Sequence, residues 1–286
     1  MSVEVQKARV DRSSPWRQGS VLGPNSVALL GLELSPGAVL VVISHDCDLA
    51  EQSTAREPNV ELILGELKPS ANGSLKFGKS PRTLHLSYQN PEGMEIVVEL
   101  SATKKRIEER TAWFFEHQPD ANYWLTPQNI GVLRSWLSTR YERAAFSNSF
   151  VTRMSIGKTA EALANKFKND DCVSQIYFNV DKGQEKELDD AEQTHTLEIV
   201  LAYLPGSDPE QNEYKAEKVA EEVEELFTKN FFDAQQGFWK FIRLKSCMAI
   251  SEDDVTISLT RKLSEWRLEY LSHRNPEIHV MPSNRC

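Results

Sequence analysis

The stretch from Ala38 to Asp48 reads AVLVVISHDCD, and it decides the fold of the first half of the chain. Its first six residues, up to Ile43, are all apolar, and most of them are β-branched. A short continuous run of this kind predicts a strand that is buried on both faces. Five polar or reactive residues follow at once, from Ser44 to Asp48. Loops at strand ends often carry functional side chains, so this segment is the first candidate site.

Several short strands are predicted around this one. The turn Ser35-Pro36-Gly37 precedes it, and Pro, Gly and Asn separate the segments that follow. Short strands at such close spacing favour a small barrel or rolled sheet, and we expect an SH3-like β-barrel. The other predicted strands cover residues 16–22, 27–34, 59–67, 83–87 and 95–100.

The remainder of the chain alternates between helical and extended patterns. Thr126-Pro127 is a helix start signal, and apolar residues recur every three or four positions over 129–145. The clearest helix covers 213–230, with an apolar stripe opposite a row of glutamates. We also predict a helix over 152–168 and strands over 173–180, 195–204, 238–250 and 254–260. The expected class is α+β: an N-terminal barrel, a helical middle, and a C-terminal antiparallel sheet with a packed helix.

The charge distribution divides the chain near residue 150. The first 150 residues carry a net charge of −1, and the rest carries −8. An acidic second half repels phosphate and argues against broad nucleic-acid binding there. We therefore predict a flexible tail over 1–14, a β-barrel with a helical segment over 15–150, an α+β domain over 151–273, and a polar tail over 274–286.

Composition and motifs exclude several classes of protein. No apolar run approaches the roughly 20 residues of a membrane helix, and the N-terminus lacks the apolar core of a secretion signal. The four cysteines, Cys47, Cys172, Cys247 and Cys286, have no C-x-x-C spacing. Reduced thiols and a cytoplasmic location are therefore expected. The G-x-G-x-x-G, G-x-S-x-G and H-E-x-x-H motifs are absent, which argues against a Rossmann cofactor site and the commonest serine and zinc hydrolases.

Three interpretations of the segment His45-Asp46-Cys47-Asp48 remain open. Cys47 could be a nucleophile activated by His45 or by a histidine distant in the sequence, although the neighbouring carboxylates would raise the thiol pKa. Alternatively, His45, Asp46 and Asp48 could hold a divalent metal together with Glu61. In the third interpretation the segment is structural, with the aspartates capping backbone N–H groups and Cys47 packed inward.

Two further groups of residues are candidates. Arg82 and His85 could face a phosphate, with Arg82 as a bidentate donor and His85 as an acid or base. Arg140 and Arg143 share a predicted helix face beside aromatic residues, a pattern that can bind nucleic acid. For each group the structural alternative is a strand histidine held by its neighbours, or arginines paired with carboxylates.

The motifs VVISHDCDLA, EPNVELILG, PRTLHL and WLSTRYERAAF together resemble an uncharacterised family of bacterial proteins found in mobile and defence-related gene neighbourhoods. The resemblance covers about Trp16 to Phe150, and it implies no established activity. The order of residues 19–22, 39–44 and 60–64 is also similar to the small toxin barrels of the MazF/PemK type. That similarity implies an SH3-like barrel more than it implies RNA cleavage.

These observations lead to two hypotheses of function. In the first, the chain is a cytoplasmic component of a bacterial defence or toxin-like system. It acts on nucleic acid or nucleotides, with His45, Asp46, Cys47, Asp48 and His85 as catalytic candidates, Arg82, Arg140 and Arg143 as substrate-binding candidates, and a divalent metal as the one cofactor considered. In the second, the chain is a non-enzymatic binding or regulatory subunit that recognises a protein partner from the same operon. Neither hypothesis involves a membrane.

Overall fold

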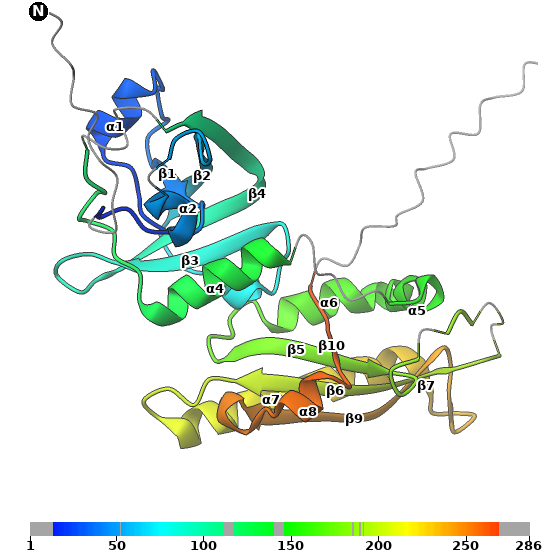
Figure 1. The fold of residues 1–286 in the computed structure, drawn as a ribbon. Helices are drawn as coiled ribbons and strands as arrows, with labels where there is room; N and C mark the ends of the chain where they lie inside the picture. The colour runs from blue at the N-terminus through cyan, green and yellow to red at the C-terminus, as the bar shows by residue number, and fades with distance from the viewer. Residues whose placement is uncertain are drawn as a thin grey trace, which may run out of the picture. The chain divides into compact units, whose positions relative to one another are not determined.

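The computed structural model describes residues 14–51, 53–110, 117–139, 146–184, 186–188, 190 and 192–268, and within them the chain is a mixed α+β fold (Figure 1). This confirms the predicted class. The chain divides into two compact units. Unit 1 comprises residues 1–143 and 166–175, and unit 2 comprises 144–165 and 176–286, so a short segment from beyond residue 150 returns to unit 1. The predicted tail over 274–286 lies outside the described residues, as does nearly all of the tail over 1–14.

Unit 1 is built on one four-stranded sheet with the order β1-β2-β4-β3. Its neighbouring strands are antiparallel. The strands are β1 (Ala38–Val42), β2 (Asn59–Lys68), β3 (Thr83–Gln89) and β4 (Glu95–Glu109). In the part of the chain that the structure describes, this sheet does not close on itself, so the predicted SH3-like barrel is not confirmed.

The strand β1 is buried on both faces, as its apolar run predicts. Val39 and Val41 belong to one core cluster, which also contains Trp136. Leu40 and Val42 belong to a second cluster on the other face of the sheet. Because successive strand residues point to opposite faces, a continuous apolar run is what a strand between two cores requires.

Two of the expected strands in unit 1 are corrected. Residues 27–34 do not form a strand, because the helix α1 (Pro24–Leu29) takes up residues 27–29; proline stands in its first turn, where the missing N–H costs nothing. Within 16–22, only Val21 and Leu22 form isolated β-bridges. The predicted helix start at Thr126 is confirmed: its Oγ1 accepts a hydrogen bond from Asn129 N at 3.2 Å and caps α4 (Pro127–Ser138).

Unit 2 places helices around a second four-stranded sheet with the order β10-β5-β6-β9. The strands are β5 (Val173–Val180), β6 (His195–Tyr203), β9 (Ile242–Ser251) and β10 (Ser264–Glu265). A small hairpin pairs β7 (Phe232–Asp233) with β8 (Phe238–Trp239). The helices are α5 (Asn148–Met154), η2 (Ile156–Lys158), α6 (Thr159–Lys166), α7 (Pro209–Phe231), η3 (Glu252–Asp254) and α8 (Ile257–Thr260).

The second sheet is not wholly antiparallel, which corrects the prediction. The strands β6 and β9 are parallel, because α7 carries the chain back along the sheet before β9 begins. Residues 254–260 form η3 and α8 in place of a strand. The expected helix over 152–168 is broken at Gly157, whose φ of +60° favours glycine and ends the regular helix.

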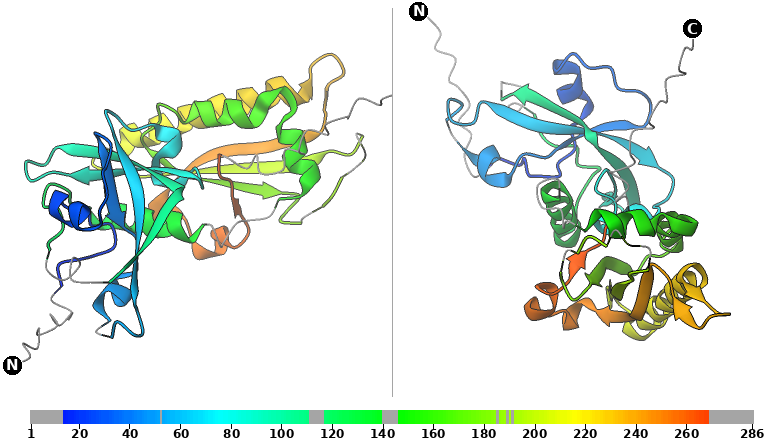
Figure 2. Two further views of the ribbon diagram at one scale, coloured as in Figure 1. Left: turned by 90° about the horizontal axis from the view of Figure 1, so that it is seen from above. Right: turned by 90° about the vertical axis from the view of Figure 1, so that its right-hand side faces the viewer.

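The helix α7 packs against β6 and β9 through its predicted apolar stripe (Figure 1, Figure 2). Ala216, Ala220, Val223 and Phe227 are buried, and the glutamates between them face outward. Asp208 caps the helix by accepting a hydrogen bond from Gln211 N at 3.0 Å. No helix in the described ranges combines the length and the apolarity that a bilayer crossing requires.

Candidate functional site

The His45–Asp48 segment lies directly after β1, but it is helical rather than extended. The helix α2 (Asp46–Ala50) begins with His45 as its N-cap, and His45 Nδ1 accepts a hydrogen bond from Cys47 N at 3.2 Å. Successive residues of a helix turn by about 100°, so residues two apart point in nearly opposite directions. The structure therefore separates the side chains of Asp46 and Asp48, which an extended strand would have placed on one side.

Asp46 is used to hold parts of unit 1 together. Its Oδ1 accepts a hydrogen bond from Gln18 N at 2.8 Å, and its Oδ2 lies 2.6 Å from Arg134 Nη2 on α4. Arg134 Nε also donates to Gln18 Oε1 at 3.0 Å. Gln18 in turn donates from Nε2 to Ile43 O at 2.8 Å, at the end of the buried strand. These contacts support the structural interpretation for Asp46.

Asp48, in contrast, lines a cavity of about 370 Å³ in unit 1. His45 and Ser44 lie on the same wall, while Cys47 is exposed and is not among the lining residues. The contact between His45 and Cys47 is to the backbone N–H and not to the thiol, so the pair is not arranged as a base and a nucleophile. The cavity is lined by Gln18, Ile43, Ser44, His45, Asp48, Glu57, Pro58, Asn59, Glu61, Lys105, Ile107 and Leu137.

The charged groups of this cavity are predominantly acidic. Three carboxylates, those of Asp48, Glu57 and Glu61, line it with one ammonium group, that of Lys105. His45 Nδ1 is an acceptor, so the neutral ring carries its proton on Nε2 and can donate from there. With His45 neutral, the residues that line the cavity have a formal charge of −2, and the nearby Arg110 guanidinium, which interacts with Asp48 and Glu57, offsets part of it.

Hydrogen bonds with buried side chains hold the residues that line the cavity. Ser44 is buried, and its Oγ accepts a hydrogen bond from Glu61 N at 2.7 Å, which joins the end of β1 to β2. Arg110 is also buried, and it donates to the backbone oxygens of Asp48 (2.7 Å) and Glu51. Burial lowers the pKa of the Arg110 guanidinium, and the nearby carboxylates oppose this effect. The residues that present Asp48 and Glu61 are thus held by buried contacts.

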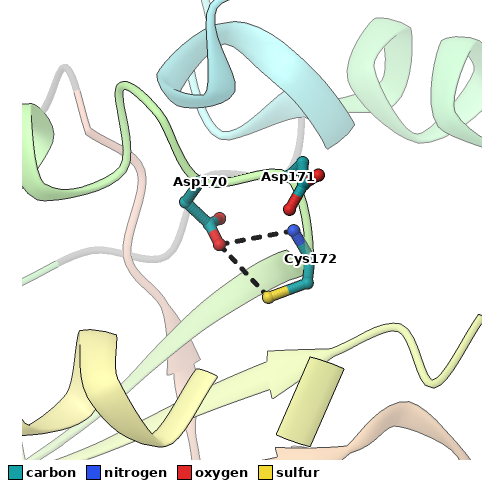
Figure 3. Close-up of side chains that lie close together, drawn as sticks. All are labelled: Asp170, Asp171 and Cys172. Atoms are coloured by element: carbon teal, nitrogen blue, oxygen red, sulfur yellow. Dashed lines mark hydrogen bonds between the residues drawn. The ribbon is translucent and has the colours of Figure 1, made fainter. Parts of the chain in front are cut away.

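The predicted metal ligands His45, Asp46, Asp48 and Glu61 are not brought together as a set. Within the described part of the chain, only Asp170, Asp171 and Cys172 place three potential ligand atoms within 4.8 Å of one another (Figure 3). Asp170 is already committed there. Its Oδ2 lies 3.1 Å from Lys79 Nζ, and its Oδ1 lies 3.3 Å from both Cys172 N and Cys172 Sγ. The buried ammonium group of Lys79 already neutralises the Asp170 carboxylate, so this cluster does not suit a metal ion.

Lys79 also belongs to a segment that was not among the predicted sites. Residues 73–80 read GSLKFGKS, which matches the G-x-x-x-x-G-K-S spelling of a phosphate-binding loop. A functional loop of this type leads from a strand into an α-helix and exposes its lysine to phosphate. Here the segment forms η1 (Gly73–Gly78), it leads into β3, and the Lys79 side chain is 1 % exposed and paired with Asp170. The motif therefore does not form a nucleotide-binding site in this chain.

His85 and Arg82 do not line the cavity. His85 is buried in β3, where its Nδ1 accepts a hydrogen bond from Asn72 N at 3.0 Å and its Nε2 lies 2.9 Å from Glu99 Oε2. Both ring nitrogens are thus engaged by the protein, which matches the structural alternative for this residue. Arg82 is exposed at the start of β3. Arg140 and Arg143 lie outside the described residues.

Glu57 and Lys105 belong to the cavity but were not predicted as site residues. Lys105 reaches it because β4 pairs with β2 in a register that sets Lys105 opposite Ile63, two positions from Glu61. No spacing in the sequence reveals a cross-strand register of this kind. For Glu57, the signal in the sequence is its position just before Pro58 and β2, and the start of β2 lies beside the end of β1.

Comparison with protein-family models finds no match, and comparisons with curated proteins and with solved structures find none at a significant level. The resemblances described from the sequence therefore receive no independent support.

Proposed function

We propose that the chain is a binding or regulatory subunit whose acidic cavity in unit 1 receives a basic side chain of a protein partner. The observation that carries this proposal is the charge of the residues that line the cavity, which include three acidic residues and one lysine. Such a cavity attracts an arginine or lysine and repels the phosphates of a nucleic acid. Arginine fits best, because its planar guanidinium can donate to two carboxylates at once.

The setting that we propose is a cytoplasmic, defence or toxin-like system in which the partner is encoded in the same operon. The sequence resemblance to proteins of such gene neighbourhoods supports this setting. An SH3-like arrangement of the N-terminal strands, with the cavity at the end of β1, is part of the same proposal. Binding residues often lie on loops at the ends of strands. In this chain the cavity lies where β1 passes into α2.

The proposal is tested by measuring the affinity of the full chain for each protein encoded by the adjacent genes, using calorimetry. We expect Asp48→Asn combined with Glu61→Gln to weaken binding at least tenfold, and added salt to weaken wild-type binding. Glu92→Gln is the matched control, since Glu92 is exposed in the turn between β3 and β4 and does not line the cavity. Equal affinities for the wild-type protein and the double variant, with unchanged melting temperatures, would contradict the proposal.

A second candidate function is a phosphoryl-transfer or nuclease reaction in the same cavity. The observation in its favour is that a histidine donor and a lysine lie beside the three carboxylates, and carboxylate oxygens are the ligands that Mg²⁺ prefers. Because the ligand atoms are not assembled, an ion would have to draw the side chains of Asp48, Glu57 and Glu61 together.

Calorimetric titration with Mg²⁺ and Mn²⁺, together with cleavage assays on single-stranded RNA and DNA, separates the two functions. Metal binding at micromolar affinity that is lost in Asp48→Asn, with cleavage that depends on the metal, would favour the nuclease. Binding of an arginine-bearing partner with no metal-dependent cleavage would favour the binding subunit.

A further inference from the structure

Unit 2 contains a hydrogen-bonded row of three side chains that come from three different elements. Ser149 lies in the first turn of α5, Asp181 directly follows β5, and His195 begins β6. Ser149 Oγ lies 3.1 Å from His195 Nε2, and His195 Nδ1 lies 2.6 Å from Asp181 Oδ2. His195 is fully buried, the side chain of Asp181 is 10 % exposed, and Ser149 is half-buried.

The proton positions in this row follow from the partners of Asp181. Its Oδ1 accepts hydrogen bonds from Thr196 N at 2.8 Å and from Thr196 Oγ1 at 3.2 Å, so the carboxylate is an acceptor throughout. With Asp181 ionised, Nδ1 of the neutral His195 ring carries the proton that is shared with Oδ2. The lone pair on Nε2 then faces Ser149, and the serine hydroxyl donates to it. This is the protonation pattern of an activated serine.

The surroundings of Ser149 support this direction of the hydroxyl. Leu188 N donates to Ser149 Oγ at 3.0 Å, which leaves the hydroxyl proton for another partner. The other oxygens near it, Ser147 Oγ at 3.3 Å and Lys186 O at 3.5 Å, are farther away than His195 Nε2. The nearest acceptor is thus the histidine.

Asp181 is held in a backbone conformation that favours glycine. Its φ is +49°, in the left-handed region, and its N–H donates to Thr196 O at 2.9 Å. A non-glycine residue is uncommon in this region and is held there by its surroundings. Here the conformation directs the carboxylate toward both His195 and Thr196.

We propose that Ser149 is a nucleophile activated by His195, with Asp181 as the positioning residue, and that unit 2 hydrolyses an uncharged carboxylic ester. This activity is separate from the binding function proposed for unit 1. Phe150, which is fully buried, packs edge-on against the His195 ring, with the ring centroids 5.5 Å apart, and holds the imidazole in place. The Glu187 carboxylate beside the Ser149 backbone disfavours an anionic acyl group, which is why the proposed ester is uncharged.

The reaction proceeds in two balanced steps. Ser149 Oγ bonds to the carbonyl carbon while its proton passes to His195 Nε2. The bond from that carbon to the alcohol oxygen then breaks, and the alcohol leaves with the proton from Nε2. Water next gives a proton to Nε2 and attacks the acyl carbon. Ser149 Oγ leaves, recovers a proton from Nε2, and the carboxylic acid is released.

Two residues between β5 and β6, Glu187 and Leu188, contact Ser149. The carboxylate of Glu187 accepts hydrogen bonds from Asn148 N at 2.7 Å and Ser149 N at 2.9 Å, and these bonds hold the pKa of Glu187 below its usual range. Leu188 is anchored by Arg153 Nη2, which donates to Leu188 O at 2.8 Å. These contacts place the Glu187 carboxylate beside the Ser149 backbone, so we expect that loosening them makes the serine more accessible to an ester.

The test is covalent labelling of the full chain with a fluorophosphonate, with the labelled residue mapped by peptide mass spectrometry. We expect labelling at Ser149 that is several-fold faster in Glu187→Gln, because a neutral side chain holds the two N–H groups less tightly. Within the Glu187→Gln background, Ser149→Ala removes the adduct and His195→Gln slows its formation at least 100-fold. Ser207→Ala, which changes an exposed serine of the same unit, leaves labelling unchanged. Hydrolysis of p-nitrophenyl acetate follows the same order.

Asp181→Asn tests the positioning role through a spectroscopic signature. An amide that donates to Nδ1 favours the tautomer with the proton on Nε2, so the ¹⁵N shifts of His195 exchange their assignments while the fold remains. The proposal is overturned if neither the wild-type protein nor Glu187→Gln forms an adduct at Ser149 while both melt as native proteins. It is equally overturned if His195→Gln labels at the wild-type rate.

Discussion

Replacement of Asp170 removes one partner of a buried ion pair in unit 1, and we expect it to destabilise the protein severely. Lys79 Nζ lies 3.1 Å from Asp170 Oδ2, and the two side chains are 1 % and 3 % exposed. Removing one partner of such a pair costs about 3–5 kcal/mol, because the other charge is left buried. Asp170→Ala also deprives Val173 N, 3.1 Å from Oδ2, of its acceptor, which adds about 1 kcal/mol.

Asp170→Asn separates these two effects, because the amide oxygen still accepts from Val173 N. We expect it to cost about 3 kcal/mol and to lower the melting temperature by about 10 °C. Asp171→Asn, which changes the exposed neighbour, costs less than about 0.5 kcal/mol. The double variant Lys79→Met/Asp170→Asn regains at least about 1 kcal/mol relative to Asp170→Asn, since no charge is then buried.

The pH dependence gives an independent check. Burial lowers the pKa of the Lys79 ammonium against the opposing effect of Asp170, and loss of Asp170 lowers it further. Between that lowered pKa and 10.5 the unfolded chain binds more protons than the folded one, so the contribution of Lys79 to stability rises with pH. The destabilisation in Asp170→Asn therefore shrinks as the pH approaches 10. A variant within about 1 kcal/mol of the wild-type protein, or a double variant no more stable than the single one, would refute the reasoning.

Three further predictions concern other parts of the molecule. Val223→Asp places an unpaired charge in the buried stripe of α7 and should cost several kcal/mol in urea unfolding; an unchanged midpoint would show that the stripe is not core. A double-mutant cycle of Asp46→Ala and Arg134→Ala should give a coupling energy below about 1 kcal/mol, because both side chains are partly exposed and water screens their charges. A larger coupling energy would contradict this expectation. Burial raises the pKa of the Cys247 thiol to about 12, so peptide mapping after alkylation at pH 8 should find the exposed Cys47 modified well before Cys247, and faster alkylation of Cys247 would refute this. The free energy of unfolding should also fall as the pH rises from about 9 toward 12, because the folded protein keeps the Cys247 proton that the unfolded chain loses.

The sequence alone predicted the elements whose signals are local. The run from Ala38 to Ile43 predicted a strand buried on both faces, and β1 supplies residues to two core clusters. Thr126 and Pro127 predicted the start of α4, and the stripe of α7 was readable from its spacing. These predictions succeed because helix caps and apolar periodicity act over a few residues.

Expectations failed where a local pattern fitted two structures. The apolar residues near Val27 suit either a strand or the short helix α1, and Pro24 in the first turn decides for the helix. Residues 254–260 lie in η3 and α8, because Ser251 and Thr256 cap these helices with their side chains. The parallel pairing of β6 with β9 depends on where α7 returns the chain, which no short segment encodes.

The candidate site shows the same division between sequence and tertiary structure. The sequence determined that reactive side chains gather after β1, but only the fold assigned Asp46 to an ion pair with Arg134 and Asp48 to a cavity shared with Lys105. The row of Ser149, Asp181 and His195 was invisible in the sequence. Its members come from three elements, and side chains so far apart in the chain meet only when strand order, register and helix packing are fixed together.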